Sequence, residues 1–166
     1  MRRRITALLC LLAGLAWPAS ALALSRGEPA PDFTLRDAGG RSVTLSSLRG
    51  RMVYLDFWAS WCGPCRQSFP WMDAAQRRFG RDRLVVLAVN VDEDAGAATD
   101  FLREHPAGFT VVFDARGRVA ERYALPGMPA SFLIGPDGRV RRTHLGFRAG
   151  DGERLDALLA QELAQP

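Results

Sequence analysis

Residues 52–65 read MVYLDFWASWCGPC, an apolar run broken only by Asp56 and followed by two cysteines three positions apart. The apolar part, residues 52–58, predicts a fully buried strand in the middle of a sheet. The following segment, residues 62–79, repeats apolar positions on one helical face and stops at Gly80, so it predicts a helix. The cysteines therefore stand where a buried strand gives way to a helix.

Two cysteines in this strand-to-helix context are typical of a redox site. The thiolate is the nucleophile in disulfide exchange, and the free amides of a helix N-terminus lower the pKa of a thiol placed there. Cys62, first in the helix, is therefore the expected attacking sulfur. Cys65 lies one turn inward, within reach of the mixed disulfide that Cys62 forms, so we expect it to release the product.

The rest of the chain alternates strands and helices, with no repeat, low-complexity tract or linker after residue 25. Before the central strand we expect a hairpin and a short turn capped by Ser46 or Ser47. The predicted elements are a hairpin of 33–35 and 43–45, strand 84–91, helix 95–104, strand 111–113, helix 119–123, strands 131–134 and 140–145, and helix 151–163. This order predicts one α/β domain over residues 24–166, with a partly parallel sheet.

The first 23 residues have the organisation of a secretory signal peptide. Three arginines, residues 2–4, precede an apolar stretch, residues 5–17, and alanines at positions 21 and 23 form an A-x-A cleavage site before Leu24. The alternative is an uncleaved anchor, because residues 5–24 reach the ~20 residues that a spanning helix needs. Pro18 and Ser20 interrupt the run and favour cleavage. The domain is therefore expected in the periplasm or another extracytoplasmic compartment, or anchored to the inner membrane if the signal is retained.

Charge and cysteine usage narrow the function further. The chain has a formal charge of +4 and no lysine, and loss of the signal arginines leaves 19 basic against 18 acidic residues. A nucleic-acid surface is therefore not expected. Loss of Cys10 leaves only Cys62 and Cys65 in an oxidising compartment, and a disulfide over so short a loop adds little stability. Reactivity explains the pair better than structure does.

A zinc site is the alternative interpretation of the cysteine pair. Tetrahedral zinc needs two further ligands, and only His105 and His144 are available. Their surroundings are those of ordinary surface or strand histidines. We expect no metal and no cofactor.

Two segments carry a resemblance to a known family. Residues 56–65, DFWASWCGPC, look like the active-site stretch of thioredoxins, and residues 127–129, GMP, resemble their loop with a cis-proline. The longer N-terminal hairpin, the export signal and the segment after the second strand resemble the extracytoplasmic TlpA and ResA type, which includes cytochrome c maturation reductases. The likeness spans residues 27–163. It implies a thioredoxin-like fold: a central mixed sheet flanked by helices, with an N-terminal β-hairpin extension.

The resemblance also implies roles for individual residues. Pro129 would be cis and face the two sulfurs, and Met128 would offer backbone hydrogen bonds to an extended substrate segment. Asp56 would lie beneath the resolving cysteine, as a buried carboxyl with a raised pKa that accepts a proton. An acid paired with a buried arginine is the alternative for Asp56. The other substrate-binding residues would be Trp61, Gly63 and Pro64.

One position departs from the TlpA and ResA pattern. Many of those relatives have a glutamate three residues after the second cysteine, where this chain has Ser68. This weakens a specialised cytochrome c maturation role and moves proton handling to Asp56.

Gly63 and Pro64 match the reducing thioredoxins, so we expect a reductase. Its partners would be disulfide-bonded exported proteins and a membrane thiol protein that supplies electrons.

Two other classes of protein remain as alternatives. Residues 29–35, PAPDFTL, also resemble the opening of peroxiredoxins, but Leu55 and Ala59 stand where a peroxidase needs proline and a hydroxyl residue. A binding module for copper or a thiol protein is the second alternative. Copper transfer would need Met128 or His144 beside the cysteine pair.

Overall fold

The computed structural model describes residues 24–164, so the predicted signal peptide lies outside the described residues. Within residues 24–164, no helix is both long enough and apolar enough to cross a bilayer. The elements in chain order are β1 (Thr34–Asp37), β2 (Ser42–Thr44), the 3₁₀ helix η1 (Leu45–Leu48), β3 (Met52–Trp58), α1 (Gly63–Phe79), β4 (Leu84–Asn90), α2 (Ala95–Glu104), β5 (Thr110–Phe113), α3 (Arg118–Arg122), β6 (Ala130–Ile134), β7 (Val140–Leu145) and α4 (Asp151–Leu163).

One mixed sheet of seven strands, in the order β2-β1-β5-β4-β3-β6-β7, forms the centre of the molecule. β3, β4 and β5 are parallel, whereas β6 and β7 continue the sheet antiparallel on the other side of β3. The hairpin of β1 and β2 joins the sheet through an antiparallel pairing of β1 with β5. The predicted mixed sheet and N-terminal hairpin are therefore confirmed.

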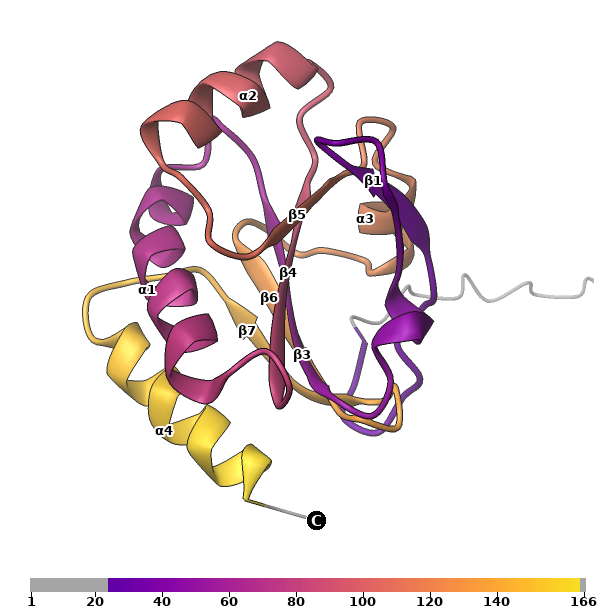
Figure 1. The fold of residues 1–166 in the computed structure, drawn as a ribbon, viewed down its shortest axis with the longest axis vertical. Coiled ribbons are helices and arrows are strands. Elements are labelled where there is room, and N and C mark those ends of the chain that lie inside the picture. The colour runs from indigo at the N-terminus through magenta and orange to yellow at the C-terminus, as the bar shows by residue number, and fades with distance from the viewer. Residues whose placement is uncertain (1–23, 165–166) are drawn as a thin grey trace, which may run out of the picture.

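Helices cover both faces of this sheet (Figure 1). α1, α2 and α4 pack over one face, and their buried residues join a cluster with Tyr54, Trp58 and Cys65. We refer to this cluster as the α1-side core. α3 lies on the opposite face, where Val119 packs with Val53, Leu55 and Phe57 in a second cluster, the α3-side core.

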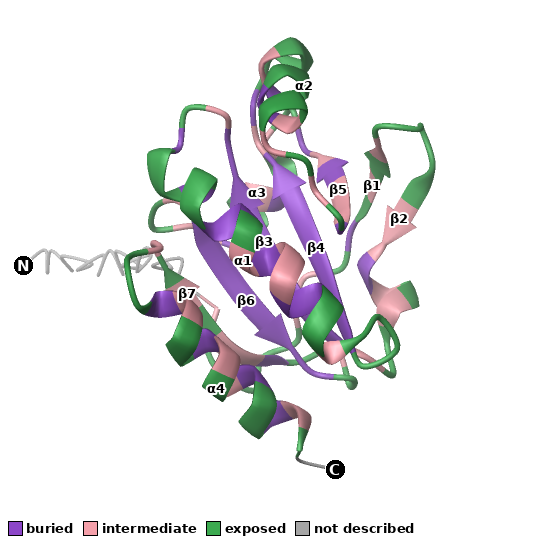
Figure 2. Ribbon diagram, turned by 60° about the vertical axis from the view of Figure 1, so that its left-hand side comes forward, coloured by how far each residue is buried: buried purple, intermediate pink, exposed green. Residues whose placement is uncertain are grey.

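β3 and its neighbours form the most deeply buried part of the sheet. All residues of β3, β4 and β6 are buried, as Figure 2 shows. Successive side chains of a strand point to opposite faces, so a strand between two helical layers must be apolar at nearly every position. Asp56 is therefore the exception in β3 that needs an explanation.

The ends of α1 follow from its sequence. Cys62 is the N-cap residue and Pro64 lies in the first turn, where its missing N–H costs no hydrogen bond. Arg77 and Arg78 lie in the last turn, which favours positive charge, and Gly80 ends the helix with a φ of 75°. Phe69 and Met72 belong to the buried face, as predicted.

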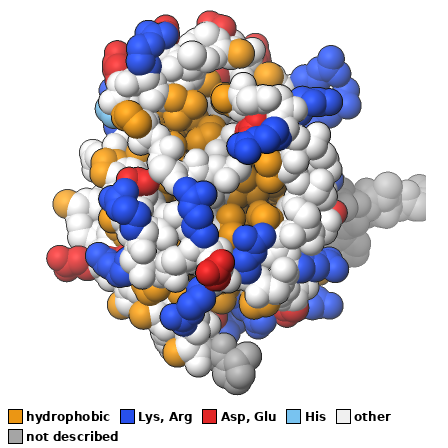
Figure 3. Space-filling view, viewed as in Figure 1, with side chains coloured by type: hydrophobic (Ala, Val, Ile, Leu, Met, Phe, Trp, Pro, Cys, Tyr) orange, Lys and Arg blue, Asp and Glu red, His pale blue; other side chains and the backbone are white. Residues whose placement is uncertain are grey.

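The outer parts of the sheet are less enclosed. β2, with three residues, and β7 are the two edge strands. Between α2 and the hairpin the surface is hollowed, and Figure 3 shows apolar side chains at the bottom of this hollow. Its lining residues include Leu102, Phe109 and Val111.

The predicted elements are all present. The bounds of β3, α2, β7 and α4 agree with the prediction, and the other bounds differ by one or two residues. The predicted cap was wrong: no side chain caps η1, and Ser47 donates its hydroxyl to the carbonyl of Thr44 instead.

Candidate active site

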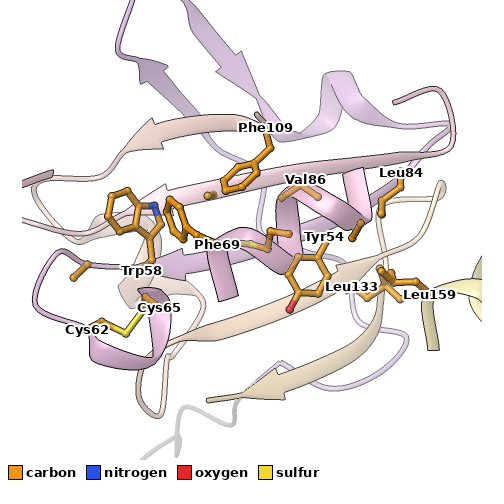
Figure 4. Packing of buried hydrophobic residues seen from close by; sticks show 14 of the residues in the cluster. Tyr54, Trp58, Cys62, Cys65, Phe69, Leu84, Val86, Phe109, Leu133 and Leu159 are labelled. Carbon is orange, nitrogen blue, oxygen red and sulfur yellow. A yellow bond between two sulfur atoms is a disulfide. The ribbon is translucent and has the colours of Figure 1, made fainter. Parts of the chain in front are cut away.

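The two cysteines form a disulfide at the N-terminus of α1. The Cα atoms of Cys62 and Cys65 are 5.3 Å apart. Only 4% of Cys62 and 0% of Cys65 is exposed, whereas the neighbouring Trp61 is 68% exposed. Figure 4 shows the disulfide at one end of the α1-side core. Both cysteines are therefore buried, with Cys65 fully enclosed and Cys62 slightly exposed beside the exposed Trp61.

The local backbone places Cys62 in a favourable electrostatic position. Cys62 is the N-cap of α1, and the N–H of Cys65 donates to its carbonyl over 3.1 Å. The first turn contains no acidic residue that would offset the partial positive charge of the helix N-terminus. A thiolate on Cys62 is therefore stabilised by the amides of the first turn.

The loop before β6 lies at the same end of the central strands as the disulfide, where β3 finishes and β6 begins. Phe57, near the end of β3, pairs with Ala130, the first residue of β6. The Met128–Pro129 peptide bond is cis, as predicted, and the carbonyl of Pro129 accepts from the N–H of Gly146. The loop is thereby tied to the end of β7.

Around this end of the strands the predicted substrate-binding residues differ in exposure. Trp61, Gly63 and Pro64 are exposed, Met128 is half-buried, and Pro129 is buried. Trp58, by contrast, is buried and packs against Phe69 with a ring-centroid distance of 4.9 Å. The two tryptophans of the motif thus have different functions: Trp58 fills the core and Trp61 faces solvent.

Asp56 is buried in the centre of β3, with only 2% of the residue exposed. It lies on the same face of β3 as Tyr54 and Trp58, the face that α1 covers with Cys65. Its Oδ2 atom has no hydrogen-bond partner among residues 24–164, so the alternative of a carboxylate paired with a buried arginine is not supported. Burial raises the pKa of Asp56 well above its ordinary value.

Sequence reasoning missed a row of polar residues beside Asp56. Ser131 of β6 is the cross-strand partner of Asp56, and His144 of β7 is the cross-strand partner of Ser131. The hydroxyl of Tyr54 donates to Ser131 Oγ over 2.8 Å, and Ser131 Oγ contacts the carbonyl of His144 at 3.5 Å. Burial, and then the charge of Asp56, raise the pKa of Tyr54. Strand register brings these residues together, and the sequence contains no local signal for it.

Ser68, the position at which the sequence departs from the expected pattern, is buried in α1. Its hydroxyl donates to the carbonyl of Cys65 over 3.0 Å. The side chain is therefore engaged with the helix backbone. A hydroxyl also cannot accept a proton at neutral pH as a carboxylate does.

Comparison with known proteins agrees with this geometry. Residues 26–143 match the AhpC/TSA family. The thiol-disulfide oxidoreductase ResA of Bacillus subtilis (strain 168) is 37% identical over 123 residues, 74% of this chain and 69% of that protein. The ResA of Geobacillus thermodenitrificans (strain NG80-2) is 34% identical over 149 residues, 86% of each chain. A crystal structure described as a thiol:disulfide interchange protein DsbE, from Chlorobium tepidum, is 48% identical with a TM-score of 0.82, covering 85% of this chain and 99% of that one.

The fold, the strand–turn–helix position of the disulfide and these relatives define a thioredoxin-like thiol–disulfide oxidoreductase. The chain belongs to the AhpC/TSA family. The positions that a peroxidase would need for proline and a hydroxyl residue are occupied by Leu55 and Ala59, both fully buried apolar residues. The peroxidase alternative therefore gains no support from the site.

Proposed function

We propose that the protein reduces disulfides in exported proteins by dithiol–disulfide exchange. The observation that carries the proposal is the placement of Cys62 at the N-cap of α1, with Cys65 enclosed one turn behind it. Both cysteines are buried, but Cys62 keeps slight exposure and lies between the exposed Trp61 and Gly63, so a partner reaches its sulfur first. Only the Cys65 sulfur lies where it can attack Cys62 from within.

The exchange proceeds in two balanced steps. The Cys62 thiolate attacks one sulfur of the substrate disulfide, a mixed disulfide forms, and the other substrate sulfur leaves as a thiolate. The Cys65 thiol then loses its proton and attacks Cys62, which releases the second substrate thiol. The protein gains the Cys62–Cys65 disulfide, the form described above, and the substrate gains two electrons and two protons.

We assign the deprotonation of Cys65 to Asp56. The carboxyl lies on the face of β3 that α1 and Cys65 cover, and its Oδ2 has no partner among residues 24–164 that would compete for the proton. Burial raises the pKa of Asp56, and a carboxyl with a raised pKa holds an abstracted proton more firmly than an exposed carboxyl does. Ser68 cannot take this role, so we do not assign a specialised cytochrome c maturation function.

We propose that the partner binds at the end of β3 where the disulfide lies. Trp61, Gly63 and Pro64 supply exposed, uncharged surface around Cys62. In the cis-proline loop, Met128 supplies backbone groups for an extended segment of the partner, whereas the carbonyl of Pro129 is bonded to Gly146. A partner with an accessible disulfide on an extended segment fits this surface best.

The direction of the reaction is tested by the reduction potential. Because Gly63 and Pro64 separate the cysteines, as in reducing thioredoxins, we expect a potential of roughly −270 mV rather than the roughly −120 mV of a strong oxidant. The ~150 mV difference corresponds to ~7 kcal/mol and is easily measured by equilibration with a redox buffer. A value above about −180 mV would overturn the assignment as a reductase.

We further propose that residues 1–23 direct export and are removed before Leu24. The domain then works in the periplasm or another extracytoplasmic compartment, and a membrane thiol protein returns it to the dithiol form. Intact-mass measurement of the protein isolated from its native compartment tests this. Retention of residues 1–23 on a membrane-bound protein would favour the anchor instead.

A further inference from the structure

The turn before Cys62 is held by a buried acid on a different strand. Asp92 follows β4 and is only 5% exposed. Its Oδ2 accepts from the backbone N–H of Ser60 over 2.9 Å, and its Oδ1 accepts from the hydroxyl of Ser60 over 3.0 Å. One carboxylate thus holds both the main chain and the side chain of Ser60.

A third donor completes the coordination of this carboxylate. The side-chain amide of Asn90 donates to Asp92 Oδ2 over 2.7 Å, and its oxygen accepts the N–H of Asp92 over 3.1 Å. Hydrogen bonds to a charged acceptor are stronger than neutral ones, and a buried carboxylate with three donors is well satisfied. Asp92 and Asn90 therefore form a fixed anchor at the end of β4.

Ser60 is a central residue of the turn that delivers Cys62 to α1. The N–H of Cys62 donates to the carbonyl of Ala59 over 3.1 Å, so Ser60 and Trp61 are enclosed by this hydrogen bond. The parallel pairing of β3 with β4 continues one residue further, where Val91 donates to the carbonyl of Trp58. The position of Cys62 relative to the sheet thus depends on the anchor that Asp92 provides.

We propose that Asp92 is a positioning residue of the redox site, which holds the turn from Ala59 to Cys62 through Ser60 and so fixes the place of the reactive sulfur. The inference rests on the proposed role of Cys62 as the attacking thiol. Asparagine at position 92 is close in shape to aspartate but has only one acceptor oxygen, and its NH₂ group would face a donor of Ser60. The turn then loses part of its attachment while the fold keeps its shape.

The chain offers a matched control in Asp114. This aspartate is also buried, follows β5, and accepts from the N–H groups of Val119 and Ala120 over 2.8 and 3.0 Å. It holds the start of α3, which lies on the other face of the sheet from α1. Asp114→Asn therefore makes the same chemical change at a buried carboxylate that holds the start of α3 and not the turn before Cys62.

The test measures the reaction of the reduced protein with a small aromatic disulfide, 4,4′-dithiodipyridine, as a function of pH. At pH values where the attacking thiol is fully ionised, the rate constant reaches a plateau. The plateau depends on the position and accessibility of the Cys62 sulfur and no longer on the fraction of thiolate. We expect Asp92→Asn to lower this plateau by about tenfold, since small displacements of reacting atoms are costly. Asp114→Asn should leave the plateau within about twofold of the wild type while lowering the midpoint of denaturant unfolding.

Two variants of Ser60 complete the test. Ser60→Ala keeps the backbone hydrogen bond and loses the hydroxyl, so it should lower the plateau by a few fold even if Asp92→Asn does not fold. Ser60→Thr keeps both the backbone N–H and the hydroxyl, so it should retain the plateau of the wild type. Equal plateaus in the wild type, Asp92→Asn and Ser60→Ala would overturn the positioning role, as would an equal loss in Asp114→Asn. If the reactive thiol survives Cys62→Ser, the assignment of the attacking sulfur fails instead, and the two failures are thereby distinguished.

Discussion

The two faces of β3 differ in composition although both are buried. On the α3-side face, Val53, Leu55 and Phe57 pack in an apolar cluster, with the ring of Phe57 5.1 Å from that of Tyr123. On the α1-side face, Tyr54, Asp56 and Trp58 bring polar groups into the core. The Oδ2 atom of Asp56 and the Nε1 atom of Trp58 have no hydrogen-bond partner among residues 24–164.

With the proposed role of Asp56, this difference separates stability from chemistry between the two faces of a single strand. Buried polar atoms without partners each cost free energy of folding. β3 accepts this cost only on the face that lies beneath the cysteines, while the opposite face follows the ordinary rules of apolar packing. Substitutions on the α1-side face should therefore change activity and its pH dependence. Substitutions on the α3-side face should change stability alone.

The largest effect is expected on the α1 side, at the cysteines. Cys62→Ser should abolish the reduction of insulin disulfides while changing the stability of the reduced protein little. Cys65→Ser should instead trap mixed disulfides, because Cys62 attacks but is not released. Mass spectrometry of the adducts and alkylation of the reduced protein measure this. Preferential alkylation of Cys65 over Cys62 would reverse the two roles.

On the α3 side, Phe57→Ala should cost on the order of 3–5 kcal/mol of stability, because it leaves a cavity among Leu55, Tyr123 and Phe132. The reduction potential of the folded variant should stay that of the wild type, since no reacting group is touched. Denaturant unfolding and redox equilibration measure the two quantities. A shifted potential would show that the two faces are not separate in function.

Asp56→Asn should lower activity and raise stability at the same time. Loss of the base should slow the release of product by on the order of 100-fold. The carboxyl has a folded pKa above its unfolded value of ~3.9, so the native state binds more protons and the free energy of unfolding of the wild type falls as pH rises above ~3.9. The free energy of unfolding stops falling once the pH exceeds the folded pKa. The total loss is ~1.4 kcal/mol for each unit by which the folded pKa exceeds the unfolded pKa.

The amide of Asp56→Asn does not ionise, so its advantage should be absent below pH ~3.9 and grow above it. Denaturant unfolding of the oxidised proteins across pH measures this. Asp114→Asn is the control with the opposite sign, because that carboxylate is held by two backbone amides and its loss should destabilise. Equal stability of Asp56→Asn and wild type at every pH, with unchanged turnover, would remove Asp56 from the mechanism.

The smallest effect is expected for Tyr54→Phe, which removes the hydroxyl that donates to Ser131. The loss should be about 1 kcal/mol, because the ring keeps its edge contact with Trp71 and only one hydrogen bond disappears. Combining it with Ser131→Ala should cost less than the sum of the single changes. Full additivity in this double-mutant cycle would mean that the two hydroxyls do not interact.

The sequence predicts those features that depend on local pattern. The apolar period of residues 151–163 gives the bounds of α4, and the apolar run 52–58 gives β3. The strand-to-helix position of Cys62 and Cys65 likewise follows from residues close in the chain. The cis form of Pro129 follows only from the resemblance to thioredoxins, and the structure agrees.

The parts that the sequence does not predict depend on register between distant strands. Asp56 and Ser131 are direct partners only because β6 pairs with β3 in one register out of several that the apolar pattern allows. Ser60 and Asp92 are 32 positions apart, and neither the serine nor the aspartate has a local feature that marks it. Such contacts arise from tertiary packing, which the local sequence pattern does not encode.

The two edge strands also bear on association between copies of the protein. An exposed strand edge offers unpaired N–H and C=O groups to other chains, and short or charged edges discourage such aggregation. β2 has only three residues, and β7 carries Arg141, Arg142 and His144. Edges guarded in this way disfavour sheet-to-sheet association between copies of the protein, even though Trp61 is left exposed on its surface.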